Sequence, residues 1–265
     1  MSNSIHHQQQ LYQHQSKYSP SIVEINNKAV MALESRQLQE AMDGFTLALR
    51  LSKEWVISCC DANVAQREQQ GRHCSLDELM RRSFQDNSED EEQRPAPSPQ
   101  QSYIYRKAIP MTSDVVGDNY DESSTVLLSC ILFNLALAYQ MSVENLHYDD
   151  ARRITNLEKA VKLYEMSYNA AKQRTGDDDD GSSHNDGGDD DTGVTPLFAM
   201  ATVNNMAIIY RSLNKPEESE SLLQHLLSTI VYLTDCGEGK LVSEFQGFFQ
   251  NVSPLMAKSC TAAAA

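Results

Sequence analysis

The sequence has little of what marks secreted, disulfide-stabilised or membrane-spanning proteins. Its six cysteines are scattered and include no Cys-x-x-Cys pair, so we expect reduced thiols and a cytoplasmic or nuclear location. The first twenty residues are rich in Gln, His and Ser and lack an apolar core, which predicts no secretory signal. The longest apolar run, residues 126–139, is interrupted by polar residues and short for a bilayer, so we expect a buried helix and no membrane partner.

Positive charge is also scarce. Lys and Arg number 22 against 37 acidic residues, and the net charge of −15 argues against nucleic acid as a partner. Thirteen of the carboxylates lie in two runs without Lys or Arg, residues 86–92 and 177–191, so the rest of the chain is almost neutral. We expect both runs to be solvated, disordered insertions.

Patterns typical of catalysis or metal binding are missing as well. No nucleophile–base pairing, glycine-rich phosphate loop or carboxylate pair stands out, so we expect no enzymatic activity and no cofactor. The Asp-rich run 177–191 does not fit a calcium-binding EF-hand, because no register with Gly at position 6 puts a carboxylate at position 1. The tail histidines and His73-Cys74 lack the spacing of a zinc site, so no metal is expected.

Helical periodicity dominates the rest of the chain. Apolar residues at helical spacing predict paired helices in three places, with Ser19-Pro20 and Thr195-Pro196 as helix starts. The predicted organisation is a Gln/His-rich disordered tail (1–18), a first hairpin (19–66), a mostly disordered insertion (67–122), second and third hairpins with a short C-terminal helix near 241–249 (123–250, interrupted by a loop at 176–193), and a flexible tail (251–265).

One stretch inside the insertion differs from its surroundings. Residues 103–109 (YIYRKAI) alternate large and other residues and contain two tyrosines. This pattern predicts a short strand or an extended segment that lies on the helices.

Two short stretches, FNLALAYQM and NNMAIIYRS, are variations on one pattern. In each, an Asn precedes an Ala by two residues (Asn134 and Ala136, Asn205 and Ala207), and a Tyr follows the Ala after three more. Similar spacings of small and large residues relate three helical hairpins, which begin near Ala29, Ala136 and Ala207. This pattern resembles the tetratricopeptide repeat (TPR), and the third unit is most similar to the kinesin-light-chain type.

The resemblance implies an all-α fold: a right-handed α-solenoid of about three TPR-like hairpins with a concave face lined by the first helix of each. It places Asn27, Asn134 and Asn205 on that face, where their amides either bind the backbone of an extended peptide or are simply solvated. Arg211 either grips a carboxylate there or is an ordinary exposed arginine. Chaperone-binding TPRs use cations at positions where this chain has none, so a chaperone C-terminal tail is not expected as partner.

We therefore expect a scaffold or adaptor that holds a peptide or helix of a protein partner in the concave groove. The alternative is an assembly subunit with a permanent interface through the solenoid edge and the Phe-rich segment 245–249. Ser88 is followed by four acidic residues, which is the context preferred by an acid-directed kinase, so we list it as a phosphorylation site.

Overall fold

The computed structural model describes residues 21–60, 76–85, 102–112, 115, 120–144, 146, 151–172, 195–235 and 246–262. Within these ranges all the long regular elements are α-helices, so the predicted all-α class is confirmed. They are a helix over 21–34, α2 (Leu38–Cys60), α3 (Leu76–Gln85), α4 (Tyr120–Ser142), α5 (Ala151–Lys172), α6 (Pro196–Ser212), α7 (Pro216–Asp235) and α8 (Gln246–Ala262).

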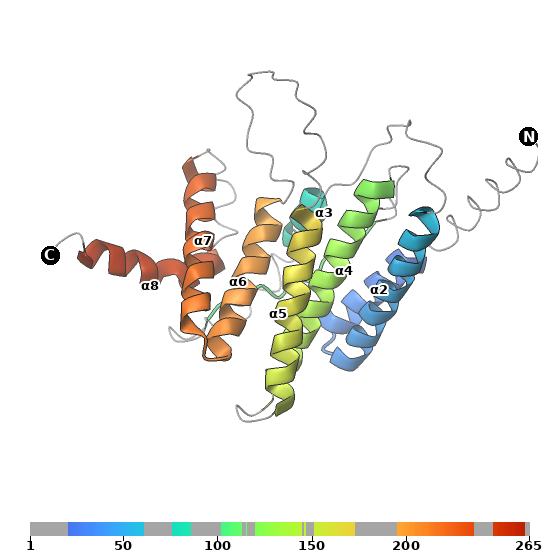
Figure 1. The fold of residues 1–265 in the computed structure, drawn as a ribbon, viewed down its shortest axis with the longest axis horizontal. Coiled ribbons are helices and arrows are strands. Elements are labelled where there is room, and N and C mark those ends of the chain that lie inside the picture. The colour runs from blue at the N-terminus through green and yellow to red at the C-terminus, as the bar shows by residue number, and fades with distance from the viewer. Residues whose placement is uncertain are drawn as a thin grey trace, which may run out of the picture.

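Apart from α3, the helices form a row in chain order (Figure 1). α2 contacts α4, α4 packs along α5, α5 contacts α6 and α6 packs along α7. α8 contacts α7 and α6 at the C-terminal end of the row, and α3 packs against α6. The 21–34 helix and α8 consequently lie at opposite ends of the row.

Two of the turns between paired helices have the same construction. Arg36 (φ 61°) and Asn214 (φ 58°) are the residues in the left-handed region, one in each turn. The next residue donates its N–H to a carbonyl five residues back, from Gln37 to Ala32 (2.8 Å) and from Lys215 to Tyr210 (2.9 Å). This is the Schellman arrangement that ends a helix and reverses the chain. Residues 26–41 and 204–219 are thus structural equivalents.

Small residues are buried at corresponding positions of the three helix pairs. Those on the first helices are Ala29, Ala136 and Ala207, those on the second helices are Ala41, Ala160 and Ser219, and all six are buried. Gly44 of α2 is so near the 21–34 helix that an added methyl carbon would lie 2.8 Å from the Ala29 Cβ. The small side chains therefore set the short distance between helices, as the sequence spacing predicts.

α4 is the central helix of the core. Among the described helices it is the one long and apolar enough to cross a membrane, over Ser123–Ser142, but 78% of that window is buried inside the structure. Length and composition of this kind are equally expected of a core helix. Its inward side includes Phe133, whose ring packs against Tyr164 of α5 and Phe198 of α6 at centroid distances of 5.4 and 5.5 Å.

Within the range 67–122 the structure describes α3, with Leu76, Leu79 and Met80 buried, and residues 102–112, which are extended. No strand forms over 103–109, because these backbone groups bind side chains rather than a neighbouring strand. α8 occupies Gln246–Ala262, across most of the range predicted as a tail, since Phe248, Val252 and Leu255 give it a buried side.

Candidate functional site

Residues 102–112 form an extended segment that crosses four helices, and an asparagine from each helix binds it. The pairs, in the order of the row, are Asn27 of the 21–34 helix with Met111, Asn134 of α4 with Ile109, Asn205 of α6 with Tyr105, and Asn251 of α8 with Tyr103. We call these four asparagines the asparagine row and residues 102–112 the inner segment. The inner segment runs opposite to the order of the helices.

Each pair consists of two hydrogen bonds to one residue. At Ile109, the backbone N–H donates to Asn134 Oδ1 (2.7 Å), and Asn134 Nδ2 donates to the Ile109 carbonyl (2.9 Å). At Tyr105, both bonds with Asn205 are 2.8 Å long. Asn27 and Asn251 repeat the arrangement, with distances between 2.7 and 3.0 Å.

The chemistry of the pair explains why asparagine is used. In an extended chain the N–H and C=O of one residue point to the same side, and those of the next residue point away. A side-chain amide offers one acceptor and one donor group at matching positions, whereas a carboxylate can only accept. The eight bonds bind backbone and carry no information about the side chains of the bound segment.

Proline fits this pattern at position 110. Its missing N–H falls between Ile109 and Met111, at a residue that makes no pair with the asparagine row. A proline also restricts the residue before it to extended conformations. Pro110 therefore favours the conformation that the row binds.

Two further asparagines connect the row into two clusters of the same design. Asn26 donates to Asn27 Oδ1 (3.2 Å) and to the Ile109 carbonyl (3.3 Å), and its own Oδ1 accepts from Asn134 (3.1 Å). Asn204 likewise donates to Asn205 Oδ1 (3.1 Å) and to the Tyr103 carbonyl (3.2 Å), and it accepts from Asn251 (2.6 Å).

The two clusters follow from the equivalence of residues 26–41 and 204–219. All six asparagines except Asn27 are buried, so their amides depend on each other and on the inner segment for hydrogen bonds.

Side chains of the inner segment fill the space beside the asparagines. Tyr105, Ile109 and Met111 are buried, and Tyr103 is half-buried. The ring of Phe248 from α8 lies edge-on to Tyr103 (5.4 Å) and stacks with Tyr105 (6.2 Å).

A buried hydroxyl completes the hydrogen bonding of Asn205. Asn205 Nδ2 donates to Tyr164 Oη (2.9 Å), and that hydroxyl donates to Gln140 Oε1 (2.9 Å). Asn205 thereby uses both of its N–H groups, and its Oδ1 accepts from Tyr105 and Asn204. Burial raises the pKa of Tyr164, and the bond from Asn205 offsets this only in part, so the phenol stays neutral.

Charged side chains also bind the inner segment. The Arg106 guanidinium pairs with Glu144, just after α4, and Glu144 also pairs with Arg36 at 3.0 Å. Near the other end, Arg211 donates to the Ser102 hydroxyl at 3.1 Å. The segment is thus anchored by apolar burial, amide pairs and ion pairs together.

The residues singled out from the sequence meet at this site. Asn27, Asn134, Asn205 and Arg211 all bind the inner segment. The three asparagines bind the backbone of the chain's own residues 105–111, whereas the two readings left open were binding of a partner peptide and plain solvation. Arg211 meets a hydroxyl rather than a carboxylate.

Sequence reasoning missed Asn26, Asn204 and Asn251. Asn251 precedes Ser253 by two residues, which is the Asn-to-small-residue spacing seen in the three hairpins, so a search for that spacing finds it. Ser88 and Phe245 lie outside the described residues. Phe248 is buried against the inner segment and is not exposed for contact with another chain.

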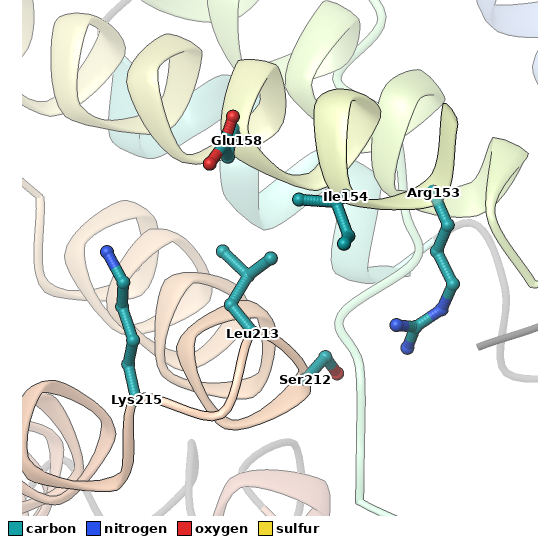
Figure 2. Close-up of a pocket in the computed structure, with 6 residues that line it drawn as sticks. All are labelled: Arg153, Ile154, Glu158, Ser212, Leu213 and Lys215. Atoms are coloured by element: carbon teal, nitrogen blue, oxygen red, sulfur yellow. The ribbon is translucent and has the colours of Figure 1, made fainter. Parts of the chain in front are cut away.

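A small hollow lies on another part of the row, between the start of α5 and the turn from α6 to α7. Figure 2 shows Ile154 of α5 facing Leu213 of that turn, with Arg153, Glu158, Ser212 and Lys215 around them. Its volume is about 140 Å³, well below the range of roughly 300 Å³ and more that holds small-molecule ligands. Within the described part of the chain, no three His, Cys, Asp or Glu side chains gather as a metal site would require.

Comparisons of the chain with protein-family models, with curated proteins and with solved structures gave no match. The function is therefore inferred from the geometry of the asparagine row itself.

Proposed function

We propose that the chain is a protein–protein interaction scaffold in which the asparagine row binds an extended peptide. The observation that carries this proposal is the set of four two-bond amide pairs along one extended backbone. Such pairs are a general device for holding a peptide in extended form, because they bind groups that every peptide has. In the free chain the inner segment occupies this position.

The proposed architecture is a right-handed TPR-like α-solenoid whose concave face carries the row. Three observations support it: the equivalent turns at Arg36 and Asn214, the buried small residues between paired helices, and the successive contacts from α4 through α5, α6 and α7 to α8. α8 then corresponds to the first helix of a fourth, incomplete unit, because Asn251 stands where Asn205 stands in the third.

A binding role fits the site better than catalysis. Its polar groups are mainly amides, which neither titrate near neutral pH nor act as nucleophiles. The charged groups are paired with each other at its edge. We therefore propose a polypeptide partner, with no cofactor or nucleic acid. An acidic chaperone tail fits poorly, since Glu144 would face it.

The alternative role, a permanent assembly subunit, keeps less support. Phe248 belongs to the Phe-rich segment 245–249 of the expected interface, and it is buried within the molecule. A stable oligomer in light scattering would nevertheless favour that role.

The proposed site is tested by removing the inner segment from the chain and adding it back as a separate peptide. Residues 102–112 are replaced by Gly and Ser in the full chain, and a labelled synthetic peptide of residues 102–112 is added. We expect the peptide to bind, with the helical circular dichroism and thermal midpoint of the protein rising on binding. The matched control carries Asn134→Ala and Asn205→Ala as well, and it should lose the peptide.

Two outcomes contradict the proposal. One is a folded Gly/Ser protein that does not bind the peptide. The other is a Gly/Ser protein that is unfolded and is not refolded by an excess of the peptide, because the segment would then be an inseparable part of the core.

A further inference from the structure

We propose that the inner segment is a tethered self-ligand that closes the asparagine row in the free chain and is displaced by a partner peptide of the same chemistry. That partner is an extended peptide with a basic residue between two buried apolar anchors. This inference rests on the proposed function and adds to it the regulation of the site and the class of its ligand.

The first argument is that the asparagine row does not depend on the sequence of what it holds. All eight bonds of the row end on backbone N–H or C=O groups, as do the bonds from Asn26 to Ile109 and from Asn204 to Tyr103. Exchange of the inner segment for another extended peptide preserves every one of them. The buried amides of Asn134 and Asn205 remain satisfied in both states, so the exchange leaves no unpaired polar group.

The side chains of the inner segment define what a competing peptide needs. Tyr105 and Ile109 are fully buried and lie four residues apart, so they are the main anchors. Between them, Arg106 pairs with Glu144. The ligand class is therefore an aromatic residue followed directly by arginine, with a branched aliphatic residue four positions after the aromatic one. Its N-terminal end lies towards α8.

The second argument is the length of the tether. Only seven residues, 113–119, separate the inner segment from the first residue of α4. A short tether gives an effective concentration on the order of 1 mM. For a segment with an intrinsic Kd of about 1 μM, the site would be closed about 1,000 times as often as open, and an external peptide would bind about 1,000-fold more weakly. A lower affinity of the inner segment for the asparagine row should thus raise the apparent affinity of the row for an external peptide.

The experiment compares the wild-type full chain with a Tyr105→Ala/Ile109→Ala variant, in which the row is intact and the self-ligand is weakened. Binding of a fluorescent peptide of residues 102–112 is followed by anisotropy. We expect the variant to bind at least about 100-fold more tightly than the wild type. A peptide with Arg106→Glu should bind more weakly to the variant. Adding Asn134→Ala and Asn205→Ala to the variant should remove binding.

Hydrogen exchange of the wild-type chain provides a measurement that does not depend on a variant. The amides of Tyr105 and Ile109 should exchange through a local opening that is far more frequent than global unfolding. Exchange only through global unfolding, or a folded variant that binds no more tightly than wild type, overturns the self-ligand. If either result is found and the Gly/Ser protein still binds the peptide, the asparagine row remains a peptide-binding site. Only the proposal that the inner segment closes this site is then wrong.

Discussion

The two ends of the inner segment are bound by the same polar arrangement in different surroundings. At each end a central asparagine, Asn26 or Asn204, joins two members of the row and one backbone carbonyl. The Tyr103–Tyr105 end packs against aromatic rings, whereas the buried side chains at the other end, Ile109 and Met111, are not aromatic, and the ion pair of Arg106 with Glu144 lies between the two ends. The comparison separates two roles: the amides fix where the backbone lies, and the surroundings determine how tightly each end is held.

The largest expected effect comes from a carboxylate placed in the cluster around Asn204, compared with a carboxylate placed in the cluster around Asn26. In Asn205→Asp, a fully buried carboxylate would face the Tyr105 carbonyl without a hydrogen to donate, and we expect unfolding free energy to fall by about 3 kcal/mol or more. Asn27→Asp, at a half-buried position with the same pair, should cost about 1 kcal/mol. Denaturant unfolding measures both, and equal losses would contradict the role assigned to burial.

The same variant has a definite pH dependence. Burial would raise the pKa of an aspartate at position 205 above its value of about 3.9 in the unfolded chain. The folded state would then hold the proton more tightly, so the stability of Asn205→Asp should decrease as pH rises from about 4 to 7. The unfolding midpoint of Asn27→Asp should change much less over this range.

Next in size is Gly247→Ala, which acts on the aromatic end alone. A methyl carbon at this position would lie 2.3 Å from the Tyr103 ring, so the ring must shift and its edge-on contact with Phe248 must change. We expect a loss of about 1–2 kcal/mol. Hydrogen exchange should accelerate at the Tyr103 amide and stay unchanged at Met111. Acceleration at both amides would show that the two ends of the inner segment are not held independently.

Tyr164→Phe tests the hydroxyl beneath Asn205. Removing it leaves Asn205 and Gln140 each without one partner, at a cost of about 1 kcal/mol at neutral pH. Tyr210→Phe is the matched control, because its bond to Glu165 is exposed and should be worth less than about 0.5 kcal/mol.

Alkaline pH provides a second measurement on the same variant. Since burial raises the pKa of Tyr164, the unfolded chain releases the proton first, near pH 10. Wild-type stability should fall as pH rises above about 10, and Tyr164→Phe should lose less over that interval. An identical alkaline slope in both proteins would refute this account of the hydroxyl.

The smallest effect is expected at the ion pair. Glu144→Gln removes the carboxylate that Arg106 and Arg36 share, and these groups are between 24% and 52% exposed. The expected loss is below about 1 kcal/mol and should shrink further in about 0.5 M salt. Unfolding at low and high salt measures it. A loss that is independent of salt would point to packing rather than charge.

Much of the fold could be predicted from spacing alone. Small residues such as Ala136 and Ala207 recur at fixed distances from large ones, and close helix packing requires that spacing. The same spacing drew attention to Asn134 and Asn205. The alternation over 103–109 also indicated an extended backbone, which proline at 110 reinforces.

The sequence could not show that the asparagines bind the extended segment. Asn205 and Tyr105 are 100 residues apart, and a bond to backbone leaves no complementary residue to search for. The central positions of Asn26 and Asn204 depend on distances between helices that no local pattern encodes. The C-terminal helix was predicted near 241–249, whereas α8 spans Gln246–Ala262. A proline such as Pro254 is unfavourable inside a helix, and the burial of Val252 and Leu255 favours the helix in spite of it.

The course of the inner segment has a consequence for how the molecule unfolds. An array of hairpins in which each unit touches only its neighbours can fray from either end. Here one strip of backbone is bound both by the 21–34 helix and by α8, so release of that strip removes hydrogen bonds from both ends of the row at once. Loss of the inner segment should therefore loosen the 21–34 helix and α8 together, whereas damage confined to α8 should stay at the Tyr103 end.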